Sequence, residues 1–254
     1  MALQKTEAIL LRRQEVRETS LMLVAFSRDL GKFHGLVKGV RGARAAVPWF
    51  LEPLTLQSVI LYERRRSPWV LVSAFDLLDP FDAVRRDLVR TAYAGFCLDL
   101  TDAMTETGDP HPEIFELLLA ALRGLGQGAD PRSMARCLEV RLLSASGLLP
   151  EADALGLTPG AALSLQQILQ TPLERINRLR LARPVEEELR VTSQRRLHGV
   201  LNRELKSRNF LQALGLETTE AGQGVPPATR IGGGRPPPAF RQALRPWTRA
   251  GTHR

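Results

Sequence analysis

The first 79 residues carry the apolar patterns of β-strands. Five runs rich in Val, Leu, Ile and Phe are separated by turn signals, and they cover residues 7–13, 20–27, 32–40, 54–62 and 69–77. None of the segments between these runs is long enough for the helix that a parallel crossover requires. The pattern therefore predicts a small five-stranded antiparallel barrel.

A predicted hairpin over residues 20–40 carries the clearest candidate chemistry. Its first strand is almost continuously apolar, so both faces of that strand are expected to be covered. Its second strand leads through Lys38 into a glycine-bearing loop that contains Arg41 and Arg44. Because glycine lets the backbone approach a ligand closely, this loop is a plausible grip for the phosphates of a nucleic acid.

After Asp79 the apolar residues recur at helical spacing. The pattern predicts helices over residues 81–105, 112–124 and 131–147, two shorter helices over 160–170 and 173–181, and a long helix from Pro184 to about residue 211 with Arg190 on its exposed face. Beyond Leu216 the chain is dominated by Gly, Pro, Thr and Arg, a composition that cannot bury a core and predicts disorder.

These patterns predict an α+β protein with three parts. Residues 1–79 form the barrel, 80–216 a helical domain, and 217–254 a disordered tail rich in Pro, Gly and Arg. The oligonucleotide-binding (OB) fold is the commonest five-stranded barrel, and an SH3-like barrel is the structural alternative.

The charge balance adds a preference for polyanionic partners. The chain has 35 Lys and Arg against 27 Asp and Glu, a net charge of +8 and a pI near 10.4. Both ends are basic and the middle is acidic. Cys97 and Cys137 alone cannot build a disulfide framework or a zinc ribbon. No apolar run reaches the length of a membrane span, and no signal peptide is recognisable, so a cytoplasmic protein is expected.

The candidate DNA-binding residues are basic side chains on the predicted strands and loops, with one aromatic side chain that could stack on bases. They are Arg12, Arg13, Lys32, Lys38, Arg41, Arg44, Trp49, Arg64, Arg65 and Arg66. The simpler interpretation of each charge run is a solvated surface, and Phe33 and Phe50 are expected in the barrel core.

No catalytic constellation is evident. The chain has no HExxH motif, no Walker lysine loop and no dinucleotide-binding glycine pattern. The acidic residues Asp99, Asp102, Glu106 and Asp109 allow the alternative of a Mg²⁺-dependent nuclease, although a solvated helix face explains them more simply.

Several short motifs resemble those of one bacterial family. The run Glu18–Leu23, the pair Gly31-Lys32 and the run Val37–Arg41 resemble the N-terminal signature of the recombination mediator RecO. Further matches follow in the family's order: residues 51–55 (LEPLT), 138–143 (LEVRLL) and 205–208 (LKSR).

The resemblance implies an OB barrel joined to a helical domain, without enzymatic activity. Members of the family bind single- and double-stranded DNA, anneal complementary strands, and work with RecR to load the recombinase RecA onto DNA coated with single-strand-binding protein. An RNA-binding barrel protein is a further alternative with the same fold.

Two further implications concern the helical domain. It is expected to receive the acidic C-terminal tail of single-strand-binding protein, for which Arg132, Arg136 and Arg141 are the candidate cations. Many relatives carry a four-cysteine zinc module after the central helix, but Leu148–Ala162 contains no Cys or His, so no metal cofactor is expected.

Overall fold

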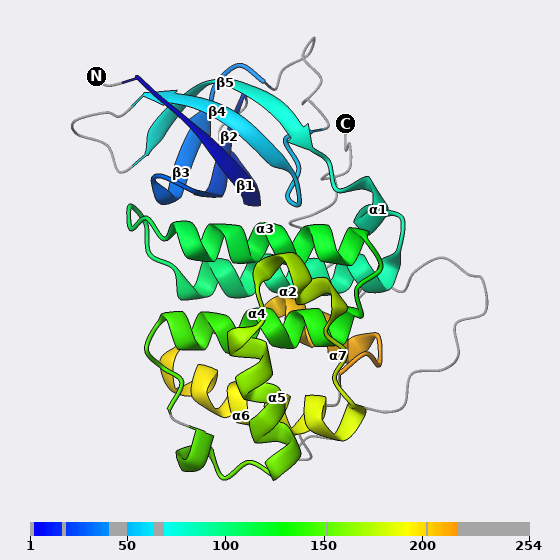
Figure 1. The fold of residues 1–254 in the computed structure, drawn as a ribbon. Coiled ribbons are helices and arrows are strands. Elements are labelled where there is room, and N and C mark those ends of the chain that lie inside the picture. Colours follow the sequence, from blue (N-terminus) through cyan, green and yellow to red (C-terminus); the bar gives the residue numbers. More distant parts are fainter. Residues whose placement is uncertain are drawn as a thin grey trace.

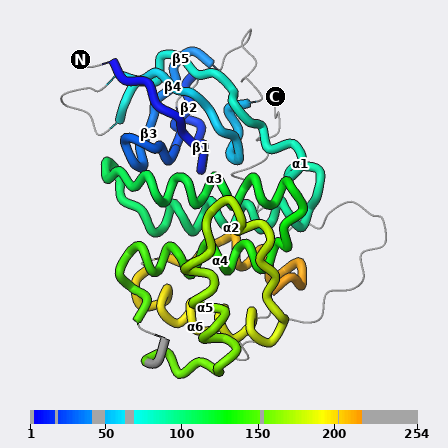
Figure 2. Tube along the Cα trace, in the orientation of Figure 1, coloured from blue at the N-terminus to red at the C-terminus, as the bar shows by residue number. Residues whose placement is uncertain are grey.

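The computed structural model describes residues 3–16, 19–40, 50–62, 69–150, 152–201 and 203–217. The chain builds the barrel first and then the helices, which lie in layers beneath it (Figures 1 and 2). The expected α+β organisation is therefore confirmed, with a five-stranded barrel followed by a helical region.

The barrel has the strand order of an OB fold. Its strands are β1 (Leu3–Val16), β2 (Ser20–Ser27), β3 (Gly31–Val37), β4 (Leu56–Tyr62) and β5 (Val70–Asp79), closed in the order β1-β2-β3-β5-β4. The expectation of an entirely antiparallel barrel is wrong at one pairing, because β3 and β5 run parallel. A closed ring with an odd number of strands cannot alternate in direction throughout, so one parallel pair is unavoidable.

The two faces of the barrel strands enter two different cores. Phe33, Val59 and Leu61 fill the barrel interior, and Phe33 is 5% exposed, as the sequence predicts. Gly35 faces that interior, where an added Cβ would lie 2.7 Å from Val72 Cγ2. Phe26 instead belongs to the core of the helical bundle. Strand β2 is consequently buried at every position.

The helical region begins with a bundle beneath the barrel. A short helix, α1 (Asp82–Arg85), precedes α2 (Leu88–Met104), whose N-cap is the Asp87 side chain accepting from Arg90 N at 3.0 Å. Helices α3 (Pro112–Gly126) and α4 (Pro131–Ala145) each start with proline in the first turn, where its missing N–H costs no hydrogen bond. In this bundle α2, α3 and α4 pack on one another.

The remaining elements pack around this bundle. They are the 3₁₀ helix η1 (Ala152–Leu155), helix α5 (Pro159–Gln170), the 3₁₀ helix η2 (Leu173–Arg178), helix α6 (Arg183–Val200) and helix α7 (Lys206–Ala213). Helices α5 and α6 pack on α4, η2 mainly on α3, and α7 on α2. The expected long helix from 184 to 211 is wrong, because α6 ends at Val200 and α7 begins only at Lys206. The segment between α4 and α5 contains η1, and the helix expected over 173–181 is a 3₁₀ turn that ends at Arg178.

Arg190 also differs from the prediction that it faces solvent. Arg190 is only 3% exposed. Its guanidinium donates to both carboxylate oxygens of Glu187 and, at 2.7 Å, to Gln194 Oε1. A buried arginine is tolerated where its donors are satisfied in this way.

The barrel meets the bundle at the turn between β2 and β3. Gly31 has a φ of +65°, and any Cβ there would clash with the backbone carbonyl of Asp109. Arg28 reaches across to α3, where its Nη2 lies 2.7 Å from Glu116 Oε1 and its guanidinium stacks over the Phe115 ring. The start of β3 is thus fixed against the loop between α2 and α3.

Candidate nucleic-acid interface

Lys32, a predicted DNA contact, lies at the junction of the barrel and the bundle. Its Nζ donates to the backbone oxygens of Asp102 at 2.6 Å and Thr105 at 2.5 Å, and it lies 3.4 Å from Asp102 Oδ1. These carbonyls end helix α2, where the last oxygens have no partner in the helix and the dipole favours a cation. The Lys32 side chain is 12% exposed, so it serves the junction.

The Asp102 carboxylate also forms ion pairs with two arginines. Its Oδ2 lies 2.8 Å from Arg12 Nε and 3.2 Å from Arg203 Nη2, and Arg203 also contacts Asp99 Oδ1 at 2.8 Å. The Asp102 side chain is only 3% exposed. We refer to Arg12, Lys32, Asp102 and Arg203 as the Asp102 cluster. It joins β1, β3, the end of α2 and the segment before α7.

The other basic residues predicted on the strands differ in accessibility. Arg13 is largely covered and binds Glu52 Oε1 at 2.8 Å. The Arg12 side chain keeps 49% of its surface exposed despite its bond to Asp102. Lys38 follows the end of β3 and is exposed.

The remaining predicted DNA contacts fall outside the described residues. Arg41, Arg44 and Trp49 belong to segment 41–49, and Arg64, Arg65 and Arg66 to segment 63–68. The described residues that flank these segments nevertheless show where they leave the barrel. Val70, which starts β5, pairs with Gly35 near the end of β3, and Tyr62 pairs with Leu71.

Strand β3 therefore has two ends with different surroundings. Its start is fixed to the bundle by Gly31 and Lys32. Near its end lie Lys38 and the strand ends from which both basic segments depart. Lys32 and Lys38 are six residues apart, about 20 Å of extended chain. That distance exceeds the Debye length of about 10 Å at 0.1 M salt, so the two lysines act independently.

His34 lies between these ends on the outer side of β3. Its pKa is lowered by burial first and then by the positive charges of Arg12 and Lys32, with the Asp102 carboxylate acting in the opposite direction. The imidazole is therefore held towards its neutral form, in which it offers a ring face and one N–H rather than a charge.

The three arginines predicted to bind a partner all have internal partners. Arg132 Nε donates to the Leu216 oxygen at 3.2 Å, and Arg141 donates to the oxygens of Ile168, at 2.9 and 2.7 Å, and Thr171 at the end of α5. Arg132 also hydrogen-bonds the hydroxyl of Tyr93, whose pKa is raised to about 12 chiefly by burial.

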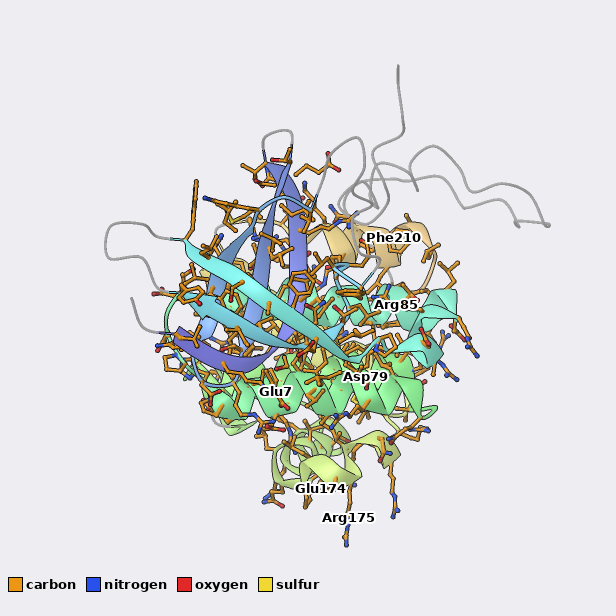
Figure 3. All side chains as sticks on the ribbon, turned by 90° about the horizontal axis from the view of Figure 1, so that it is seen from above. Glu7, Asp79, Arg85, Glu174, Arg175 and Phe210 are labelled. Atoms are coloured by element: carbon orange, nitrogen blue, oxygen red, sulfur yellow. The ribbon has the colours of Figure 1, made fainter. Side chains whose placement is uncertain are left out.

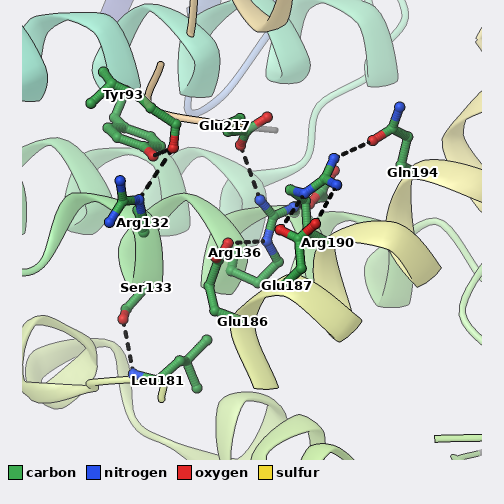
Figure 4. Close-up of polar contacts among 12 residues, drawn as sticks. Tyr93, Arg132, Ser133, Arg136, Leu181, Glu186, Glu187, Arg190, Gln194 and Glu217 are labelled. Carbon is green, nitrogen blue, oxygen red and sulfur yellow. Dashed lines mark hydrogen bonds and ion pairs between the residues drawn. The ribbon is translucent and has the colours of Figure 1, made fainter. Parts of the chain in front are cut away.

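Arg136 is completely buried among carboxylates (Figure 4). Its guanidinium pairs with Glu139, with Glu186 at 3.2 Å and with Glu217 at 3.1 Å. Burial lowers the pKa of Arg136 despite these partners. Arg136 therefore presents no surface to a partner, and Glu217, the first residue assigned to the tail, is buried within the same network.

Three of the four acidic residues considered for metal catalysis have other polar partners, and the fourth, Glu106, is exposed. Asp99 accepts from the Ser207 hydroxyl at 2.8 Å, Asp102 binds three cations, and Asp109 contacts His111 at 3.0 Å. Within the described ranges, no group of three or more His, Cys, Asp or Glu is arranged to hold a metal ion. Likewise, no helix in that part of the chain is long and apolar enough to cross a membrane.

The sequence interpretation missed the role of Asp102 and Arg203. Asp102 looked like one residue of a solvated helix face, whereas its side chain is buried between the two domains. Lys32 and Asp102 are 70 positions apart, and no local pattern connects them. Helical spacing gives the only weak indication that Asp102 is buried, because Asp102 lies on the buried face of α2.

The fold and this interface define a class of protein: an OB-type barrel, with a basic edge, docked on a helical domain. The comparisons specify the family. A family model described as "Recombination protein O N terminal" matches residues 1–81, and one described as "Recombination protein O C terminal" matches residues 85–154. Together they match more than half of the chain. The chain belongs to the RecO family of DNA repair proteins.

Individual relatives agree with this assignment. DNA repair protein RecO of Syntrophobacter fumaroxidans is 28% identical over 247 residues, covering 84% of this chain and 98% of the relative. RecO of Pelotomaculum thermopropionicum is 27% identical over 85% of this chain and 96% of the relative. RecO of Anaeromyxobacter sp. (strain K) is 32% identical over 150 residues, and the match spans 59% of that relative's length.

Replacing Asp102 with Asn tests the junction. The substitution removes the only carboxylate charge that Lys32 contacts in the described structure, so it should lower the free energy of unfolding by about 2–3 kcal/mol. This estimate lies at the low end for a buried ion pair because Arg12 and Arg203 remain partly solvated. Urea denaturation gives the measurement.

Asp109→Asn is the matched control, because the Asp109 side chain is 59% exposed and contacts only His111 among the described residues. It should change stability by less than about 0.5 kcal/mol. Equal stability of the two variants would contradict the structural role given to Asp102.

Proposed function

We propose that the protein is a non-enzymatic DNA-binding mediator of recombinational repair. It binds and anneals single-stranded DNA and, together with RecR, helps to load the recombinase RecA onto DNA coated with single-strand-binding protein. Membership of the RecO family supports this role in general terms. The cellular site of such a protein is the cytoplasm, in association with the nucleoid.

One observation carries the DNA-binding part of the proposal. Lys38 is exposed at the end of β3, beside the strand ends from which segments 41–49 and 63–68 depart. Those segments hold Arg41, Arg44, Trp49 and Arg64, Arg65 and Arg66. OB folds bind oligonucleotides with the face of strands 2 and 3 and with the loop between strands 4 and 5. Arg64, Arg65 and Arg66 belong to the connection between β4 and β5, and Lys38, Arg41 and Arg44 follow directly after strand β3, which supports a nucleic-acid site at this edge of the barrel.

The chemistry suits a protein that must hold any sequence. Lysine and arginine neutralise phosphates and release counterions, which gives affinity without base recognition. An aromatic side chain such as Trp49 adds about 1–3 kcal/mol per stacked base and tolerates every base. A strand held by its backbone leaves its base edges available for pairing, which is the requirement for annealing.

The nuclease alternative has less support. A Mg²⁺ site needs carboxylate oxygens that are not already bound to cations. Both oxygens of Asp102 face Arg12, Lys32 or Arg203, and Asp99 faces Arg203 and Ser207. An RNA-binding role would use the same basic edge, and competition between RNA and DNA distinguishes the two.

Removing the predicted phosphate contacts tests the proposal. The variant Lys38→Ala/Arg41→Ala/Arg44→Ala should bind a labelled single strand more weakly and should flatten the plot of log affinity against log salt by about 2, at roughly 0.7 per phosphate contact. Fluorescence anisotropy over a range of salt concentrations provides the slope. Incubation with Mg²⁺ should yield duplex from complementary strands and no shortened products.

The control removes the same charge elsewhere. Arg195, Arg196 and Lys206 are exposed on α6 and α7. Replacing these three with Ala should leave the slope within experimental error of the unsubstituted protein. An identical slope for both triple variants would refute the assignment of the barrel edge as the DNA-binding site.

We also propose a site for the acidic C-terminal tail of single-strand-binding protein. The donors of Arg132, Arg136 and Arg141 are already bound within the chain, and the site proposed in their place is a groove of about 330 Å³ between α6 and α7. Leu197, Leu201 and Leu205 line the groove together with His198 and Glu204. Its two arginines are already paired, Arg203 with Asp99 and Asp102 and Arg208 with Glu139, so His198 is the side chain assigned to hold the terminal carboxylate. An aromatic side chain and a terminal carboxylate are complementary to such a lining.

A short acidic peptide that ends in Phe with a free carboxylate tests this groove. His198→Glu places a negative charge in the lining and should weaken peptide binding about tenfold, or roughly 1.4 kcal/mol. Arg195→Glu, on the same helix but outside the lining, changes the charge more and should have a smaller effect. Equal weakening by both variants, or equal binding of an amidated peptide, would refute the site.

A further inference from the structure

A second basic surface lies on the helical domain. Residues 171–183 (TPLERINRLRLAR) contain four arginines and a single acidic residue, Glu174. Within this stretch, η2 covers Leu173–Arg178. The side chains of Arg175, Arg178 and Arg180 are exposed. None of these arginines contributes to the barrel edge or to the groove between α6 and α7.

The geometry of η2 aligns two of these arginines. Its hydrogen bonds span three residues, from Arg175 N to the Pro172 oxygen at 3.0 Å and from Leu179 N to the Ile176 oxygen at 3.2 Å. Side chains three residues apart are eclipsed in a 3₁₀ helix. Ile176 and Leu179 form one row, which is buried. Arg175 and Arg178 therefore form a second row that faces solvent.

Fixed contacts hold this turn against α3. Asn177 Nδ2 donates to Gln127 Oε1 at 3.0 Å, and Arg180 Nη2 donates to the Gly128 oxygen at 3.2 Å. Gly124 lets the two elements approach, since its absent Cβ would lie 3.3 Å from Asn177 Cβ. Arg123, the neighbour of Gly124 in the last turn of α3, is also exposed.

The charges of this surface are not neutralised within the part of the chain that the structure describes. Among the described residues no carboxylate forms an ion pair with Arg123, Arg175 or Arg178, and Arg180 donates only to backbone oxygens. The side chains of Glu174 and Arg175 point away from the body of the molecule (Figure 3). We name Arg123, Arg175, Arg178 and Arg180 the η2 arginine patch.

We propose that the η2 arginine patch binds the phosphate backbone of a second strand of nucleic acid, while the barrel edge holds the first. The inference rests on the proposed function and specifies how annealing is achieved. Arg175 and Arg178 are separated by about 6 Å along the axis of η2, at roughly 2 Å per residue. Guanidinium groups spaced along a rigid, exposed row suit a polyanion with regularly spaced phosphates.

Annealing requires a second cationic surface for the incoming strand, and the η2 arginine patch provides one. Two strands repel each other, and a protein that neutralises only one leaves the approach of the other unassisted. A second cationic surface on the same molecule raises the local concentration of the incoming strand and screens its charge. Because η2 is held by side-chain and backbone contacts, the patch keeps a fixed position relative to α3.

The full chain with Arg175→Gln/Arg178→Gln tests the inference. The matched control is Arg195→Gln/Arg196→Gln, which removes the same charge from an exposed site on α6. Each protein is first saturated with a short donor-labelled strand, and a complementary acceptor-labelled strand is then added. Energy transfer reports annealing, and anisotropy of the first strand reports the barrel site.

The Arg175→Gln/Arg178→Gln variant should bind the first strand normally but anneal about tenfold more slowly, because two phosphate contacts are lost. The control should anneal at the rate of the unsubstituted protein. Equal annealing by both variants would overturn this inference and leave the proposed function intact. A second measurement uses polyglutamate as a probe for an acidic protein partner. If Arg175→Gln/Arg178→Gln lost binding to polyglutamate but annealed normally, the inference would also be overturned, in favour of such a partner. Failure of the unsubstituted protein to bind any strand would overturn both proposals.

Discussion

The arrangement of the molecule depends on a buried carboxylate between its two domains. Asp102 ends up 3% exposed because Lys32, Arg12 and Arg203 surround it, and Lys32 also caps the carbonyls at the end of α2. A buried charge is stable only with such partners. The cluster therefore couples the orientation of the barrel to that of the bundle, and Gly31 permits the close contact on which it relies.

This junction assigns the basic residues of the barrel to two tasks. The residues near the start of β3 hold the domains together, and those beyond its end face solvent with the adjoining segments. Total positive charge is thus a poor guide to a DNA-binding surface. What matters is which cations already have carboxylate or carbonyl partners. By that criterion Lys38 and three arginines of the η2 arginine patch, Arg123, Arg175 and Arg178, are available to phosphates, whereas Arg180 already donates to backbone oxygens.

Local patterns predicted much of the fold. Alternation and helical spacing record which side chains are buried, so the five strands, the helices α2, α3 and α4 and the burial of Phe33 follow from them. The single helix expected over 81–105 is wrong at its start, because α1 ends at Arg85 and α2 begins only at Leu88. Roles set by distant partners could not be predicted. Lys32 meets Asp102 from 70 positions away, and Arg136 meets Glu217 from 81 positions away. Each looked like a surface cation because its partners lie in other elements.

The central claim is that the two ends of β3 have separate tasks. It is tested most directly by measuring both unfolding and salt-dependent binding of single-stranded DNA for Lys32→Met and Lys38→Met. Lys32→Met should lower stability and leave the salt dependence unchanged. Lys38→Met should leave stability unchanged and reduce the slope by about 0.7, the contribution of one phosphate contact. A reduced slope for Lys32→Met at unchanged stability would contradict the account.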